Sequence, residues 1–143
     1  MREPLAADCY RQIVEEAPDA ILYSDREGII RLWNRGAELV FGFSAAEALG
    51  QSLDLIIPEK LRARHWEGYF RVMATGRSNY GTELLSVPAL HRDGHQLSCA
   101  FSIVLIRDAD GHPAGIASVM RDVTAAWTRE KEYKARIAAL EKG

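Results

Sequence analysis

The sequence is short of the features that would place it in a specialised class of protein. It holds two cysteines, Cys9 and Cys99, in 143 residues, and their spacing matches neither a metal motif nor a redox motif. No apolar run approaches the ~20 residues that cross a bilayer, and the first residues, MREPLAADCYRQ, lack the apolar core of a signal peptide. We therefore expect a cytoplasmic protein with free thiols.

Net charge and catalytic motifs are also scarce. Lys and Arg number 18 against 20 Asp and Glu, a formal net charge of −2, so no general attraction to nucleic acid or to an anionic membrane is expected. The phosphate-binding glycine loop, the G-x-S-x-G elbow and the HExxH motif are absent. These absences argue against nucleic-acid and membrane partners and against a catalytic site, so any enzymatic output would belong to a separate module.

The periodic segments that are present predict one α+β domain with a helix at each end. The 48% hydrophobic content suits a single core. We divide the chain into a lead-in helix at 1–18, a main domain at 19–122 and a C-terminal helix at 123–143. The expected elements are a helix over 4–18, a hairpin of strands 20–25 and 29–34, a helix over 34–42, a capped turn beginning at Ser44, a long helix over 57–76, strands over 80–90, 96–106 and 114–120, and a helix from Thr124.

The long helix, IPEKLRARHWEGYFRVMATG, is the most informative segment. Pro58 suits its first position and Gly76 its end. At 3.6 residues per turn His65 lies in the middle of an apolar stripe. Burying an imidazole without a partner costs about 1–3 kcal/mol, so we expect His65 to meet one. A packed histidine bonded to a carbonyl and a metal ligand both remain open. The stripe contains Leu61, Tyr69 and Val72, is widened by Trp66, Phe70 and Met73, and lies opposite Arg64, Glu67 and Arg71.

The C-terminal helix carries a short apolar repeat. Ala126, Tyr133, Ile137 and Leu140 fit a heptad seam with a gap at Glu130, over fewer than three heptads. Two interpretations stay open: a helix packed on its own domain, or a coiled coil that pairs in a homodimer and passes a signal.

Three segments resemble the PAS sensory family. They are IIRLWNRGAELVFGFSAAEALGQSL at 29–53, RDG at 92–94 and RDVT at 121–124. The resemblance implies that 19–122 is a PAS sensor domain with a five-stranded antiparallel sheet, helices covering one face and a C-terminal signalling helix. Because the family binds haem, flavins, small acids, metals or nothing, the fold leaves the ligand open.

The long helix resembles the haem-binding PAS domains of FixL-type oxygen-sensing histidine kinases, where the histidine of an R-x-R-H segment binds the iron. This resemblance implies that His65 is the axial ligand of haem b and that the domain senses a diatomic gas (O₂, CO or NO) or redox state. A histidine kinase or another output module is the implied partner. The further implied contacts are Tyr69 beside the porphyrin, Arg71 and Asn79 near the propionates, Phe101 and Ile103 as an apolar distal wall, and Ser118 where the family has a glycine.

One departure affects the choice of gas. Leu85 stands where the FixL type has the distal arginine that hydrogen-bonds oxygen, so gas preference cannot be transferred. Tyr80 or Ser118 offers a replacement hydroxyl. A competing interpretation is a binding or dimerisation module without haem, whose pocket, lined by Leu85, Phe101, Ile103 and Ser118, holds a small organic ligand or side chains. A flavin (FAD) redox sensor is a third interpretation.

The remaining candidate residues favour structural roles. Trp33 and Asn34 are interpreted as a core plug rather than as a flavin pocket. Cys99 lies on the apolar face of its strand and is expected in the core, with a thiolate ligand as the alternative. The three other histidines fall in turns, and we expect them to be exposed; they are His91, His95 and His112.

Overall fold

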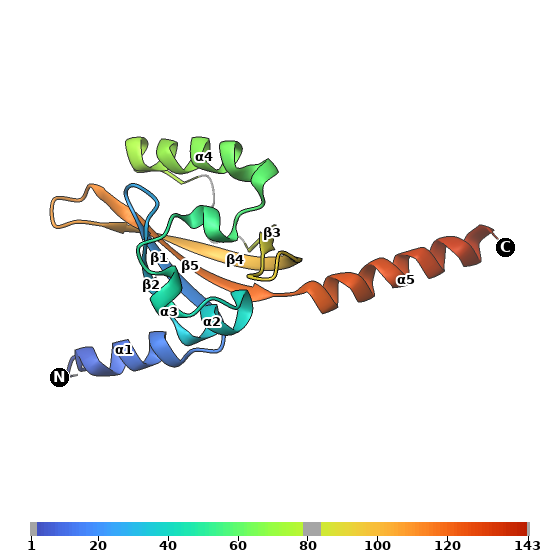
Figure 1. Cartoon of the computed structure of the whole chain (residues 1–143), viewed down its shortest axis with the longest axis horizontal. Helices are drawn as coiled ribbons and strands as arrows, with labels where there is room; N and C mark the ends of the chain where they lie inside the picture. Colours follow the sequence, from blue (N-terminus) through green and yellow to red (C-terminus); the bar gives the residue numbers. More distant parts are fainter. Residues whose placement is uncertain (1–2, 79–83, 143) are drawn as a thin grey trace.

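A computed structural model describes residues 3–78 and 84–142. Its centre is a five-stranded antiparallel sheet in the order β2-β1-β5-β4-β3 (Figure 1). The expected α+β class is confirmed. The strands are β1 (Ala20–Asp25), β2 (Ile30–Trp33), β3 (Leu85–Leu90), β4 (Gln96–Arg107) and β5 (Pro113–Asp122). The helices are α1 (Ala7–Glu16), α2 (Arg35–Phe41), α3 (Ala45–Ala48), η1 (Leu53–Ile56), η2 (Glu59–Leu61), α4 (Arg62–Thr75) and α5 (Thr124–Lys142).

Turns that contain glycine close the three hairpins of the sheet. Gly28, Gly94 and Gly111 have φ values of +81°, +90° and +83°, a region that favours glycine, and they close the β1–β2, β3–β4 and β4–β5 hairpins. The three hairpins predicted from the sequence are therefore confirmed. β5 pairs with both β1 and β4 and forms the middle of the sheet. The predicted strand over 80–90 begins at Leu85 among the described residues, because 79–83 lie outside them.

The prediction of one continuous helix over 57–76 was wrong at its start. Pro58 has an extended backbone and precedes the short 3-10 turn η2, and the α-helix α4 begins at Arg62. The end was predicted correctly, since Gly76 adopts a left-handed φ of +68° and its amide caps α4. Phe70 was also misplaced: its exposed fraction is 48%, and it stacks on Trp66 instead of joining the core. The hydroxyl of Tyr69 is bound to β1 and fixes the rotation of α4, which turns Phe70 outward.

Trp33 and Asn34 join the N-terminal elements to the core. The Trp33 indole is buried and donates to the Phe43 carbonyl at 3.0 Å. The Asn34 amide is buried, and its oxygen accepts from the backbone amides of Ile21 and Ala37, both at 2.8 Å. Its nitrogen donates to the carbonyls of Val14, Ala17 and Asp19 at 2.8, 3.3 and 3.0 Å. The expected plug is confirmed, and Asn34 is also the polar centre at which α1, β1 and α2 meet.

The terminal helix α5 projects away from the sheet (Figure 1). Its first turn is tied to β4, because the Ser98 amide donates to Thr124 Oγ1 at 2.9 Å and the Val123 amide donates to the Ser98 carbonyl at 2.8 Å. Beyond that turn its apolar side chains are exposed, including Trp127 and Leu140. Within the described residues, no helix combines the length and the apolar character needed to span a bilayer.

Candidate functional site

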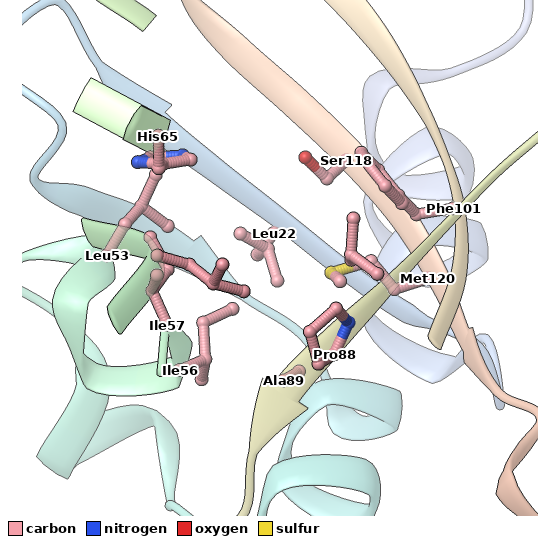
Figure 2. Close-up of a pocket in the computed structure, with 12 residues that line it drawn as sticks. Leu22, Leu53, Ile56, Ile57, His65, Pro88, Ala89, Phe101, Ser118 and Met120 are labelled. Carbon is pink, nitrogen blue, oxygen red and sulfur yellow. The ribbon is translucent and has the colours of Figure 1, made fainter. Parts of the chain in front are cut away.

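An apolar cavity of about 170 Å³ lies between the sheet and the η1–α4 segment. Figure 2 shows its walls, with His65 from α4 on one side and Ser118 and Phe101 from the sheet on the other. The wall residues come from four strands and three helical elements, so the cavity is a product of the tertiary fold. They are Leu22, Leu53, Ile56, Ile57, Leu61, His65, Val87, Pro88, Ala89, Phe101, Ser118 and Met120.

His65 is the one titratable residue among these walls. Its Nδ1 is buried and has no hydrogen-bond partner among the described residues. Burial lowers the pKa of the imidazole, and the more distant Asp54 carboxylate opposes this shift. The ring is therefore neutral at physiological pH, which is the form that binds a metal ion. Trp66 and Tyr69 contact the ring, at centroid distances of 4.7 and 5.7 Å.

The structure brings three of the sequence-predicted site residues to the cavity: His65, Phe101 and Ser118. Leu85 pairs with Phe101, and Ile103 pairs with Ser118, in the strand register. Directly paired residues share a face of the sheet, so Leu85 and Ile103 lie on the face that borders the cavity. Neither is among the residues that line it.

The remaining candidates lie elsewhere. Arg71 is on the outer face of α4, where its guanidinium donates to Glu67 at 3.1 Å, as expected for a solvated face. Asn79 and Tyr80 fall outside the described residues. Cys99 is fully buried without lining the cavity, and burial raises the pKa of its thiol to about 11. It is a neutral core residue at physiological pH, which speaks against a thiolate ligand.

Tyr69 anchors α4 to β1 instead of lining the cavity. Its hydroxyl donates to the Asp25 carbonyl at 2.5 Å and lies 2.9 Å from Ser24 Oγ. Burial raises the pKa of this phenol to about 12. The hydroxyl thus stays protonated and ties α4, the helix that carries His65, to β1.

We expect Tyr69→Phe to lower the free energy of unfolding by about 1–2 kcal/mol, since the buried Ser24 hydroxyl loses its contact with Tyr69 and the Asp25 carbonyl is left with its bond from the Gly28 amide. The native state holds the phenol proton up to a pKa of about 12, whereas an unfolded tyrosine loses it near 10. The contribution of Tyr69 is therefore complete below pH ~10 and is lost as the pH rises toward ~12. Urea unfolding of both proteins across this range checks the prediction. A difference between them that stays constant with pH would contradict it.

Eight wall residues were not singled out from the sequence, and Leu61 was placed only on the apolar stripe that carries His65. Ser118 and Met120 are two residues apart on β5, and Leu22 lies on β1, so a period of two could have found these contributions. The contribution of β3 is three consecutive residues, from Val87 to Ala89, which that period does not predict. Pro88 was harder to place, because proline is unusual inside a strand; here β3 is an edge strand of the described sheet and pairs with β4. The contribution of η1 depends on how that segment folds over the sheet, for which the sequence carries no periodic signal.

The chemistry of the wall residues suits haem, but a haem molecule needs a larger cavity than the structure shows. A neutral imidazole with an unpartnered nitrogen is a suitable iron ligand, and the opposite walls are apolar. A cavity of about 170 Å³ is close to the roughly 150 Å³ that encloses a benzene molecule, whereas pockets for larger ligands measure about 300–1,000 Å³. A porphyrin therefore fits this donor set if α4 moves outward from the sheet.

Comparisons with known proteins agree with this architecture. The chain is 44% identical over 55 residues to the sensor protein FixL of Bradyrhizobium diazoefficiens, a match that covers 38% of this chain and 11% of that protein. The chain thus spans about a tenth of the length of this relative. Among solved structures, a PAS domain from Colwellia psychrerythraea superposes with a TM-score of 0.72 at 23% identity, covering 82% of this chain and 97% of that one.

A second solved structure, an RNA-binding light-oxygen-voltage receptor, has a TM-score of 0.71 at 17% identity, covering 96% of this chain and 41% of that one. At these identities the two structures show that the fold is shared, and they carry no information about the ligand of this chain. The family profile described as the PAS fold matches residues 9–123, which is most of the chain. The chain belongs to the PAS family.

Proposed function

We propose that this PAS domain binds haem b through His65 and senses a diatomic gas or redox state. The observation that carries the proposal is the buried Nδ1 of His65, which has no partner among the described residues and lies at an apolar cavity. Leaving such a group unsatisfied costs about 1–3 kcal/mol, a cost that a bound metal removes. The 44% identity to FixL over 55 residues supports the choice of haem among the ligands of the family.

The chain's own residues would hold the group and keep water away from it. His65 supplies the nitrogen, while Leu22, Phe101 and Met120 give the facing walls an apolar surface. When bound, haem would supply an iron that takes a diatomic ligand or changes its redox state. Ser118 offers the one hydroxyl on these walls, a weaker donor than the arginine of the FixL type.

β5 provides a direct route from the cavity to α5. Ser118 and Met120 line the cavity, and two residues later the Asp122 carboxylate accepts from the Thr124 amide at 2.9 Å, at the start of α5. A change of packing at the cavity would thus reach the helix base within a few residues of one strand. Such a shift of the α5 geometry would be the output of the sensor.

We propose that this output goes to a homodimer mate and to a histidine kinase or other module. The large apolar side chains of α5 are exposed, including 56% of Ile137 and 80% of Leu140. Pairing of two α5 helices would bury them. Sedimentation equilibrium should give a dimer for the wild type and a monomer for Ile137→Glu. A wild-type monomer would contradict the pairing.

Haem reconstitution tests the iron ligand. We expect purified chain to bind about one haem with a sharp Soret band, and His65→Ala to lose that band or shift it to that of free haem. His112→Ala is the matched control, because this exposed turn histidine is not among the cavity walls and its loss should leave the spectrum unchanged. A Soret band that is the same in His65→Ala and in the wild type would refute the assignment.

A second candidate function is the binding of a small apolar organic ligand without haem. The present cavity favours it, since its volume of about 170 Å³ suits a molecule the size of benzene without any movement of α4. Phe101 and Ser118 of the pocket expected from the sequence line the cavity, while Leu85 and Ile103 do not. Benzene should then raise the melting temperature of the chain even where haem gives no Soret band, which separates the two candidates.

A further inference from the structure

The β3–β4 turn, HRDGH, brings two histidines together outside the cavity. The His91 amide donates to the His95 carbonyl at 3.0 Å, and the Gly94 amide donates to the His91 carbonyl at 2.9 Å, which closes the turn. Residues that face each other across an antiparallel pair project their side chains to the same side. The two imidazoles accordingly stack, with ring centroids 4.6 Å apart.

Asp93 stands against both rings. Its Oδ1 lies 3.2 Å from Nδ1 of His91 and contacts Nδ1 of His95. The possible ligand atoms of the three residues all lie within 4.8 Å of one another. With bond lengths of 2.0–2.2 Å, a tetrahedral zinc ion places its ligand atoms about 3.4 Å apart. Small side-chain rotations would bring the three donors to that spacing.

Neighbouring elements hold this turn in position. A Cβ built on Gly42 would lie 2.7 Å from both Cε1 and Nε2 of His91, so the end of α2 covers that edge of the ring and leaves Nδ1 toward Asp93. The Arg92 amide donates to the last carbonyl of α2 at 2.8 Å. The Arg92 guanidinium pairs with Glu47, which ties the turn to α3.

We propose that His91, Asp93 and His95 form a binding site for one divalent transition-metal ion, with Zn²⁺ as the representative. Imidazole nitrogens suit zinc, cobalt and nickel, whereas magnesium and calcium favour all-oxygen sites. Three protein ligands leave a fourth position for water. None of the three residues lines the His65 cavity, so the site is independent of the proposed haem. It lies in the hairpin at the end of the sheet from which α5 departs (Figure 1).

The β4–β5 turn, DADGH, provides a matched comparison within the same chain. It has the same spacing of side-chain donors, but they are two carboxylates and one imidazole, Asp108, Asp110 and His112. Asp108 Oδ1 already accepts from the amides of Asp110 and His112, at 2.9 and 3.0 Å. Asp93 Oδ1 likewise accepts from the His95 amide at 3.0 Å, so backbone contacts do not distinguish the two turns. The difference lies in the donors: with one imidazole instead of two, the β4–β5 turn should bind zinc more weakly.

Titration of the tag-free, haem-free chain with Zn²⁺ tests the proposal, with Co²⁺ absorption as a second readout. We expect the wild type and His112→Ala to bind one ion per chain with the visible Co²⁺ bands of nitrogen ligation. The double variant His91→Ala/His95→Ala should lose these bands and about tenfold or more in affinity. Asp93→Asn should also bind more weakly, while its side-chain oxygen still accepts the His95 amide and preserves the turn.

Three results would overturn the proposal: no saturable binding by the wild type, unchanged binding by the double variant, or loss of binding in His65→Ala, which would place the ion in the cavity. Far-ultraviolet circular dichroism of each variant separates a lost ligand from a lost fold. If the double variant does not fold, unchanged affinity in Asp93→Asn counts against the site. Failure here would leave the haem proposal untouched, because that proposal is read from the Soret band.

Discussion

Replacing Asn34 by Leu should lower the free energy of unfolding by about 3–5 kcal/mol, the largest effect we expect from any single substitution. The buried amide oxygen accepts from two backbone amides, of Ile21 and Ala37, and the nitrogen donates to three backbone carbonyls. Leucine is close in size but satisfies none of these groups. A domain of this length is typically stable by about 5–15 kcal/mol, so the loss approaches the whole margin.

Asn34→Asp separates the two halves of this network. The carboxylate retains the acceptor for the Ile21 and Ala37 amides but loses both N–H donors and faces three carbonyl oxygens. We expect an intermediate loss of about 2–3 kcal/mol. Urea unfolding followed by tryptophan fluorescence measures both variants, since Trp33, one of the three tryptophans, is buried beside the site. A loss below about 1 kcal/mol for Asn34→Leu would contradict the assigned role.

Gly36→Ala should destabilise the chain by about 3 kcal/mol even though alanine is the better helix former. Gly36 is buried in the first turn of α2, where a Cβ would lie 2.0 Å from the Asp19 carbonyl oxygen and 2.7 Å from that of Pro18. Both are backbone atoms, so they cannot rotate away. The contact should therefore outweigh the roughly 1 kcal/mol that alanine gains in helix propensity.

Gly68→Ala is the matched control. This glycine also lies within a helix, α4, but a Cβ there would meet no atom within 4 Å. Here propensity acts alone, and we expect the substitution to stabilise the chain by about 0.5–1 kcal/mol. Thermal unfolding of the two variants should thus shift in opposite directions. Shifts of the same sign would show that the close approach of α2 to Pro18 and Asp19, just before β1, does not decide the outcome.

Much of the fold could be predicted from the sequence because its signals are local. The turn at Asp93 and Gly94, the cap at Ser44 and the alternation along β4 each specify a nearby backbone conformation, and the structure confirms them. The start of α4 could not be predicted in this way. Pro58 is compatible with a first helical position, but the chain instead turns through η2 before the α-helix begins.

The candidate site was only partly predictable, because a cavity wall depends on tertiary packing. Periodicity placed His65 inward, and alternation placed Phe101 on the cavity face. The same alternation could not tell which of Phe101 and Ile103 meets empty space, since both belong to one face of β4. The direction of Phe70 was wrong for a related reason: a helix face is set by what anchors it, here the Tyr69 hydroxyl on β1.

Pro88 bears on how the domain avoids unwanted aggregation. It lies within β3, at one margin of the sheet, where an unpaired row of backbone groups invites a strand from another molecule. Proline has no amide proton to offer such a strand, and it is tolerated in a sheet where that missing donor faces solvent. This edge strand should therefore resist the edge-to-edge pairing of sheets that leads to fibrils, even at high protein concentration.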